Sequence, residues 1–253
     1  MQASIKIMGI DVDMMSNDIF IDKMNEYLTE GHLDVILFAS TGMLNRAVED
    51  EEYRCLLEQA ELFLPGEEAL LTTHHVDVLE AGDMVVSCHS FGMMLENLTK
   101  EDRTLYIIAD SGESVDKLQD YCQAMQPELR VVGSYSYMMN LEDAAVVNEI
   151  NSHTPDIILL NLPIGLQEEW LAEHAPLLNA RLCIAIGGVA ELILATRRET
   201  PRWVRKLRLG GVYHRVFREQ AVKKDVRARI FRKKVTKYNS QKEIHDYTQD
   251  DRE

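Results

Sequence analysis

The sequence lacks the long apolar run that a membrane-spanning helix requires. No uninterrupted apolar stretch in its 253 residues approaches the roughly 20 residues needed to cross a bilayer. The first fifteen residues, MQASIKIMGIDVDMM, also lack the basic start and apolar core of a signal peptide. We therefore expect a soluble, cytoplasmic protein.

Cysteine is scarce and scattered. The chain has four cysteines, which lie far apart and form no C-x-x-C pair: Cys55, Cys88, Cys122 and Cys183. This spacing argues against zinc-ribbon and thioredoxin-like sites, and reduced, buried thiols are expected. The adjacent His74 and His75 have no third ligand at a recognisable spacing. The sequence therefore predicts no metal site and no cofactor.

Complete phosphate-binding motifs are absent too. The chain contains neither G-x-G-x-x-G nor a P-loop, so dinucleotide and ATP binding are not supported. Small and polar residues nevertheless follow three apolar runs, at 109–112, 133–135 and 187–188. Glycine there lets the backbone approach a phosphate, but tight turns between strands and helices need glycine for steric reasons as well. Both explanations stay open, and the candidate ligand contacts near these turns are Gly112, Gly133, Tyr137 and Gly187.

Basic residues are few outside one segment. The formal net charge is −15, yet residues 197–237 carry 16 Lys or Arg against three acids, while residues 1–196 carry nine against 34. A concentrated basic segment suggests a negatively charged partner at that end, although no aromatic-rich module accompanies it and nucleic acid is not expected. We divide the chain into an α/β domain at 1–195, a basic appendage at 196–238 and an acidic tail at 239–253, predicted to be disordered.

Apolar runs of strand length alternate with segments of helical periodicity. A hairpin or strand is predicted at 5–15, strands at 33–40, 104–110, 129–137, 155–160 and 181–188, and helices at 19–31, 46–60, 115–125, 144–153 and 167–178. The strands are apolar on both faces, as in a parallel sheet covered by helices. The fold class is therefore α/β, with a Rossmann-like parallel sheet flanked by helices and a basic helical C-terminal appendage.

The pair Gln167-Glu168 stands where the buried run PDIILL gives way to a helix. In an open α/β sheet, ligands bind at the carboxyl ends of the strands, which favours a binding role for this pair. Acidic residues also stabilise a helix start through its dipole without any further role. The residues alone do not decide between these explanations.

The order of these segments resembles the WecG/TagA/CpsF glycosyltransferase family, from about Ile7 to about Arg232. The stretches that carry the likeness are LYIIAD, MQPELRVVGSYSYMMN, VVNEINSHTPDIILLNL, QEEWLAEH and CIAIGG, together with Gln167-Glu168 before Trp170, Pro201-Arg202-Trp203 and the basic tail. The resemblance implies a hexosyltransferase that moves a sugar, typically N-acetylmannosamine, from a UDP-sugar to a polyprenyl-diphosphate-linked acceptor. Such enzymes serve teichoic acid, common antigen and capsule synthesis in bacteria.

The chain departs from the family pattern at the residues that carry the chemistry. Phe38-Ala39-Ser40 stands in place of Thr-x-Asn, and Gly66 falls where the family has its candidate catalytic aspartate. The usual lysine before Gln167 is missing, and Phe-Asp becomes Ala190-Glu191. Glu67 and Glu68 are the candidate general bases. The alternative is a catalytically inactive relative that binds a nucleotide-sugar or a partner transferase.

The resemblance also implies the remaining contacts. The helix start at Gln167 would meet the diphosphate, Glu168 would bind hydroxyls, and Arg215 and Arg218 would bind phosphate oxygens. Glu191 is a further candidate substrate contact. Basic residues near an anionic leaflet contribute about 1 kcal/mol each. The tail is therefore expected to hold the protein at the inner face of the cell membrane. Self-association into a homo-oligomer is left open.

Overall fold

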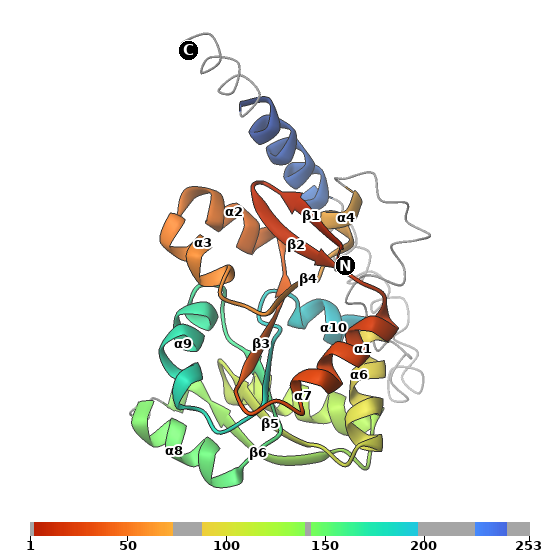
Figure 1. Cartoon of the computed structure of the whole chain (residues 1–253), viewed down its shortest axis with the longest axis vertical. Coiled ribbons are helices and arrows are strands. Elements are labelled where there is room, and N and C mark those ends of the chain that lie inside the picture. The colour runs from red at the N-terminus through yellow and green to blue at the C-terminus, as the bar shows by residue number, and fades with distance from the viewer. Residues whose placement is uncertain (1–2, 73–87, 140–142, 197–225, 242–253) are drawn as a thin grey trace, which may run out of the picture.

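The computed structural model describes residues 3–72, 88–139, 143–196 and 226–241 (Figure 1). Within these residues, six parallel strands form one sheet in the order β4-β3-β8-β7-β5-β6, and β1 and β2 form an antiparallel hairpin. The strands are β1 (Ala3–Ile7), β2 (Ile10–Met14), β3 (Asp34–Ala39), β4 (Leu62–Pro65), β5 (Thr104–Ala109), β6 (Arg130–Ser136), β7 (Ile157–Asn161) and β8 (Leu182–Ala185). The predicted α/β class with a parallel sheet is confirmed.

Helices cover both faces of this sheet. They are α1 (Asn17–Tyr27), α2 (Thr41–Glu49), α3 (Glu51–Leu57), α4 (Glu68–Thr72), α6 (Cys88–Lys100), α7 (Gly112–Met125), α8 (Asp143–His153), α9 (Leu166–His174) and α10 (Ala190–Thr196). Two short 3₁₀ turns follow β6 and α9, at Tyr137–Met139 and Ala175–Leu177. Among these elements, α4, α6 and α10 lie in segments for which the sequence predicted no helix.

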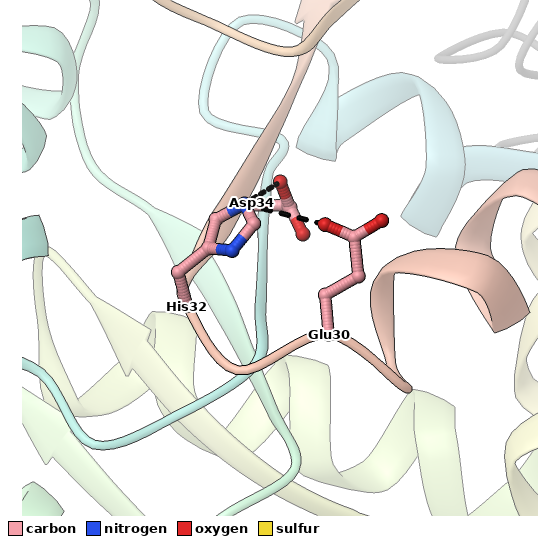
Figure 2. Close-up of side chains that lie close together, drawn as sticks. All are labelled: Glu30, His32 and Asp34. Carbon is pink, nitrogen blue, oxygen red and sulfur yellow. Dashed lines mark ion pairs between the residues drawn. The ribbon is translucent and has the colours of Figure 1, made fainter.

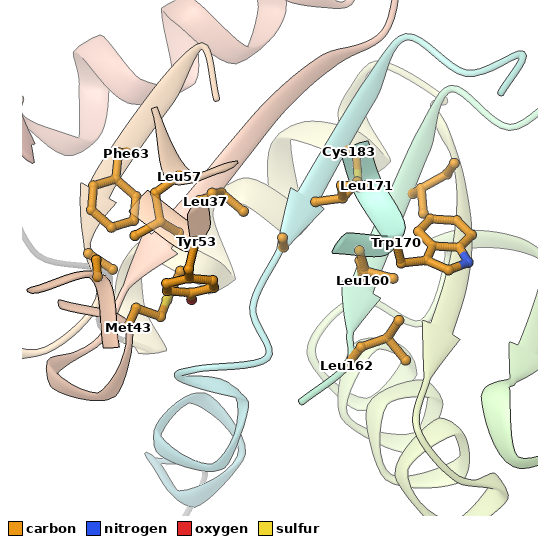
Figure 3. Packing of buried hydrophobic residues seen from close by; sticks show 14 of the residues in the cluster. Leu37, Met43, Tyr53, Leu57, Phe63, Leu160, Leu162, Trp170, Leu171 and Cys183 are labelled. Carbon is orange, nitrogen blue, oxygen red and sulfur yellow. The ribbon is translucent and has the colours of Figure 1, made fainter. Parts of the chain in front are cut away.

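The core consists of two apolar clusters, one on each face of the sheet. Helices α2, α3, α8 and α9 and the β1–β2 hairpin contribute to one cluster, and α1, α6, α7 and α10 contribute to the other. Tyr53 and Trp170 belong to the first cluster, where they pack with strand residues such as Leu37 and Leu160 (Figure 3). Burial of a large apolar side chain contributes about 1.5–3 kcal/mol, so these contacts fix which helix covers which face.

The predicted single helix at 46–60 is wrong, because the chain breaks at Asp50. That residue has extended backbone angles, φ −137° and ψ 98°, and its carboxylate accepts a hydrogen bond from the N–H of Tyr53 at 2.9 Å. A side-chain oxygen that caps a helix start stabilises it by about 0.5–2 kcal/mol. The cap starts α3 in a new direction and turns Tyr53 into the core.

The described part of the basic appendage, residues 226–238, is helical, as predicted. The helix continues to residue 241, which lies in the tail that was predicted to be disordered. Phe231 and Val235 are buried in the same cluster as the hairpin, and Tyr238 packs against it. Figure 1 shows this helix beside β1 and β2, extending outward beyond them. The hydroxyl of Tyr238 lies only 2.7 Å from where a Cβ on Gly9 would stand, so the hairpin turn meets the helix closely.

Several predicted features lie outside the described residues: His74, His75, Pro201-Arg202-Trp203, Arg215, Arg218 and most of the acidic tail. Cys122 and Cys183 are buried, as expected, whereas Cys55 is exposed, which corrects the expectation for that thiol. None of the helices in the described ranges is long and apolar enough to cross a membrane.

Candidate functional site

The sheet changes its direction of growth between β5 and β7. These strands are hydrogen-bonded neighbours, but β5 continues through α7 to β6 on one side and β7 continues through α9 to β8 on the other. The two helices leave toward opposite faces, since α7 packs in one apolar cluster and α9 in the other. In an open α/β sheet, such a reversal leaves a crevice at the carboxyl ends of the two strands, where ligands bind.

Polar groups line this switch point. Asp110 follows β5, and its N–H donates a hydrogen bond to the carbonyl of Asn161, the last residue of β7, at 3.1 Å. The carbonyl of Asp110 accepts from the N–H of Met138 at 3.0 Å, and its carboxylate accepts from the Ser111 hydroxyl at 3.2 Å. The side chains of Asp110 and Asn161 remain partly exposed. They supply a carboxylate and an amide, which suit the hydroxyl groups of a sugar or ribose.

The start of α7 lies beside this switch point, directly after β5. The Ser111 hydroxyl caps the helix by accepting a hydrogen bond from the N–H of Ser114 at 3.2 Å. A Cβ on Gly112, the first residue of the helix, would meet nothing within 4 Å. The amides of a helix start, together with its dipole, form a binding site for phosphate, and a glycine lets such a group come close. Gly112 thus lies in open space at a helix start, and its contact with a ligand stays a prediction.

The pair Gln167-Glu168 is built into the helix start of α9. The Gln167 side-chain oxygen accepts from the N–H of Gly187 at 2.9 Å, and the Glu168 carboxylate accepts from the N–H of Gly165 at 2.6 Å. The Gln167 amide also donates to Glu168 at 3.1 Å, and the two side chains are only 1% and 2% exposed. Burial, and then the adjacent Glu168 carboxylate, raise the pKa of Tyr53, which keeps this phenol neutral. These contacts agree with a structural role for the pair at the start of α9. Contact of the pair with a ligand stays a prediction.

Arg46 lies against the same helix start and was not among the candidates from the sequence. Its guanidinium stacks over the Tyr53 ring at 4.3 Å and forms ion pairs with Asp50 and Glu169 at 3.3 Å each. Gly165 has φ +96°, and a Cβ there would stand 1.6 Å from the guanidinium. Arg46 therefore occupies the space in front of α9, which leaves the start of α7 as the more accessible amide site.

Glu67 is held at another strand end, after β4. Its carboxylate accepts hydrogen bonds from the Thr41 N–H at 3.1 Å and from the Thr41 hydroxyl at 3.2 Å, at the first residue of α2. A negative charge at a helix N-terminus is stabilised by the dipole. Glu68, in contrast, is an exposed side chain at the start of α4. The structure thus separates the two candidate bases into a partly buried, engaged carboxylate and a surface one.

Gly66 has no room for any side chain. A Cβ there would stand 2.5 Å from the Val189 side chain and 2.8 Å from the carbonyl oxygen of Ala39. Its N–H donates to that same carbonyl at 2.9 Å. In this arrangement an aspartate cannot replace the glycine, so a carboxylate in this loop comes from Glu67 or from another strand end.

The carboxylates of Glu67 and Asp110 are far apart. Glu67 follows β4 at one edge of the sheet, and β5, which precedes Asp110, is four strands away in the sheet order. At about 4.8 Å per strand spacing, the two strand ends are roughly 19 Å apart. The two groups therefore do not act on the same bond. A ligand that reaches both has to lie along the carboxyl edge of the sheet.

The other glycine candidates have steric roles. Gly133 lies inside β6 and not at a strand end, which corrects its predicted place, and a Cβ there would stand 2.5 Å from the Tyr106 ring. A Cβ on Gly187 would stand 1.8 Å from the carbonyl oxygen of Leu162. These two glycines are required by packing between neighbouring segments, and neither offers open space.

The remaining described candidates lie near the strand ends. Tyr137 begins the 3₁₀ turn after β6 and is partly buried. Glu191 is an exposed side chain in the first turn of α10, after β8. The structure brings Gln167, Glu168 and Gly187 into direct contact, while Tyr137 and Gly112 follow the neighbouring strands β6 and β5.

A hollow of about 300 Å³ lies elsewhere, between α1 and α6. It is lined by seven residues: Asp18, Ile21, Asp22, Met93, Glu96, Asn97 and Lys100. These residues belong to one helical layer and include none of the strand-end groups. With three carboxylates and one lysine, this hollow does not suit a diphosphate, so the switch point remains the better candidate site.

A six-stranded parallel sheet with helices on both faces and a polar switch point defines an α/β protein of the kind that binds nucleotides at its strand ends. A sequence profile of the WecG/TagA/CpsF glycosyl transferase family matches residues 5–221, most of the chain. The protein belongs to this family of glycosyltransferases. Comparison with curated proteins gives no significant match.

Proposed function

We propose that the protein transfers an N-acetylmannosamine-like sugar from a UDP-sugar to a polyprenyl-diphosphate-linked acceptor, in the synthesis of a bacterial cell-surface polymer such as teichoic acid or capsule. The observation that carries this proposal is the polar switch point between β5 and β7 in a chain of this glycosyltransferase family. Asp110 and Asn161 offer groups for ribose or sugar hydroxyls there, and the start of α7 offers amides for the diphosphate.

Transfer of a sugar requires a base that takes the acceptor proton and groups that stabilise the departing diphosphate. Glu67 is the better of the two proposed bases, because Thr41 orients its carboxylate and holds it partly buried. Glu67 lies three strand positions from β7, or roughly 14 Å at about 4.8 Å per strand. The bond that breaks joins the sugar directly to the diphosphate, so Glu67 acts as the base only for a donor whose nucleoside lies at the switch point and whose diphosphate extends along the carboxyl edge toward β4.

The remaining candidate residues would support the loops around this site or bind the donor from the basic appendage. Gln167 and Glu168 fix the loops after β7 and β8, and a direct contact of this pair with the donor belongs to the same proposal. Gly187 would contribute through the same loop, and Glu191 and Tyr137 would lie at its margins. Arg215 and Arg218, in the matched part of the chain, would bind phosphate oxygens.

A second candidate function is a catalytically inactive relative that binds a nucleotide-sugar or a partner transferase. The packing around Gly66 favours it, because no carboxylate fits where the family has its candidate catalytic aspartate.

Release of UDP separates the two functions. Purified full-length protein is incubated with several UDP-sugars and a short-chain polyprenyl-diphosphate sugar, and UDP is measured. A sugar transferase releases UDP only when both substrates are present, and Glu67→Gln lowers the rate at least about a hundredfold, as expected for loss of a general base. The inactive relative binds UDP-sugars but releases no UDP with any donor.

The basic appendage would bring the protein to its acceptor. Phe231 and Val235 turn one side of helix 226–241 into the core, and its Arg and Lys residues lie largely outside. We infer contact with an anionic membrane surface, where each basic residue contributes about 1 kcal/mol. Sedimentation with anionic vesicles, compared with neutral vesicles, tests this inference. Self-association on the same surface is measured by light scattering.

A further inference from the structure

Three side chains with metal-ligand chemistry meet at the amino edge of the sheet, opposite the strand ends described above. Glu30 and His32 belong to the loop between α1 and β3, and Asp34 is the first residue of β3. Figure 2 shows the three side chains pointing toward one another, with the carboxylates of Glu30 and Asp34 on the same side of the His32 ring. The chain bends at residues 30–32 before it enters β3, and this bend brings the three side chains of the spacing E-x-H-x-D together.

The distances within this cluster fit a bound cation. The Nε2 atom of His32 lies 3.0 Å from an Asp34 oxygen and 3.4 Å from a Glu30 oxygen. The three ligand atoms all lie within 4.8 Å of one another. A metal ion that binds N and O ligands at about 2.1 Å separates neighbouring ligands by about 3.0 Å in octahedral and about 3.4 Å in tetrahedral geometry. The cluster therefore needs little rearrangement to surround one ion.

Asp34 supplies an independent observation. The residue is 1% exposed, and its second carboxylate oxygen, Oδ2, has no hydrogen-bond partner among the described residues. A buried carboxylate oxygen without a partner is costly, and a bound cation would satisfy it. His32 is 64% exposed along its side chain, so solvent reaches the cluster from that side.

We propose that Glu30, His32 and Asp34 form a binding site for one divalent transition-metal ion, of the Zn²⁺ or Mn²⁺ type. One imidazole and two carboxylates suit such ions, and the two negative charges balance the charge of the ion. Mg²⁺ and Ca²⁺ prefer sites made only of oxygen ligands, so they bind more weakly here. Water would complete the coordination on the exposed side.

The bound ion would clamp the loop between α1 and β3. This loop is already tied to β8, because the Arg181 guanidinium donates to the carbonyl of Glu30 at 2.6 Å and the N–H of Asp34 donates to the carbonyl of Arg181 at 3.0 Å. A metal ion bound by both Glu30 and Asp34 would add a second link between this loop and the first residue of β3. The role is structural, since the site lies at the edge opposite the switch point.

The competing explanation is an ion pair without metal, in which a protonated His32 bridges the two carboxylates. Metal titration of the full-length protein after treatment with EDTA distinguishes the two. ZnCl₂, MnCl₂ and MgCl₂ are added separately, and binding is followed by calorimetry and by the shift in the thermal unfolding midpoint. An ion that binds only the folded protein raises its stability with concentration.

The matched variants are His32→Ala and His153→Ala, because His153 also lies beside a glutamate, Glu149, but has no third ligand. We expect Zn²⁺ or Mn²⁺ to bind the wild type and His153→Ala alike, and His32→Ala and Glu30→Gln to bind at least about tenfold more weakly. Equal binding by wild type and His32→Ala, or equal binding of Mg²⁺ and Zn²⁺ at this cluster, overturns the proposal. His32→Ala and Glu30→Gln change exposed or half-exposed side chains, so both variants are expected to keep the fold.

Discussion

The side-chain oxygen of Gln167 accepts a hydrogen bond from the N–H of Gly187 at 2.9 Å. This bond joins the start of α9, after β7, to the loop after β8, and those two strands are neighbours in the sheet. The same loops touch through backbone, since a Cβ on Gly187 would stand 1.8 Å from the carbonyl oxygen of Leu162. The loops after β7 and β8, which lie next to the β5–β7 switch point, are therefore held together by packing and by the buried pair Gln167-Glu168.

Gln167→Glu is expected to destabilise the protein. The substitution keeps the shape and one acceptor for Gly187, but it places a carboxylate where the amide donates to Glu168 at 3.1 Å. Repulsion in a buried site and the lost donor cost about 1–3 kcal/mol in the free energy of unfolding. Urea denaturation measures the change, with Gln123→Glu on the exposed face of α7 as the control. The deficit shrinks as the pH falls and the new carboxyl group takes up a proton. An unchanged stability would contradict the buried pair.

Gly187→Ala and Gly112→Ala are expected to differ sharply. The first drives a methyl group into backbone and lowers the free energy of unfolding by about 1–3 kcal/mol or prevents folding. The second adds a methyl group in open space and leaves stability nearly unchanged. If the start of α7 binds diphosphate, Gly112→Ala still weakens UDP binding. Calorimetric titration with UDP checks the second result, and a folded, stable Gly187→Ala would refute the first.

Glu67→Ala and Glu67→Gln separate a structural from a catalytic role. The alanine removes the acceptor for Thr41 at the start of α2 and is expected to cost about 0.5–2 kcal/mol of stability. The glutamine keeps an acceptor oxygen, and its cost is smaller. Both variants lose sugar transfer if Glu67 is the base, while Glu68→Gln retains it. Equal activity of Glu67→Gln and wild type would remove Glu67 from the chemistry.

Asp156→Asn tests a carboxylate that ties β7 to β5. Asp156 accepts from the N–H and the hydroxyl of Thr104 at 2.8 Å each and pairs with Arg103 at 3.4 Å. Burial alone would raise the pKa of Asp156, but these hydrogen bonds and Arg103 lower it overall. The stabilisation is therefore present above the unfolded-state pKa and is lost as pH falls through the lower folded-state pKa.

The Asp156→Asn substitution is expected to lower the free energy of unfolding by about 1–3 kcal/mol near neutral pH. The difference from the wild type becomes small in acid, where the wild-type carboxylate is protonated as well. Chemical denaturation between about pH 7 and about pH 3 measures both limits. A deficit that stays constant over this interval would show that the ionised carboxylate is not what stabilises the strand ends.

The parallel sheet and the helix at 166–174 follow from patterns that the sequence displays. Apolar runs such as PDIILL are buried on both faces, so the alternation of strands and helices predicts the parallel sheet directly. The place of Gln167-Glu168 at a strand-to-helix junction was likewise predictable. The roles of the individual glycines depend on tertiary contacts, which the sequence does not display. Gly133 looked like a turn residue, but it lies under the Tyr106 ring inside β6.

The sequence did not predict the cluster of Glu30, His32 and Asp34, because its spacing matches none of the common zinc-binding motifs. Glu30 and His32 instead lie in a bend just before β3, and only the burial of Asp34 and the approach of the three side chains give that pattern meaning. Arg46 was missed for a related reason, since its contact with Gly165 depends on the angle between α2 and α9. Local periodicity in the sequence does not predict the distances between segments that are far apart in the chain.

A crystal structure of the protein soaked with UDP tests the nucleotide site most directly. We expect the diphosphate at the start of α7, within hydrogen-bond distance of the amides near Gly112, and the ribose beside Asp110 or Asn161. UDP bound instead in the hollow between α1 and α6, or a β5–β7 crevice that stays empty at saturating UDP, would contradict the assignment of the switch point as the donor site.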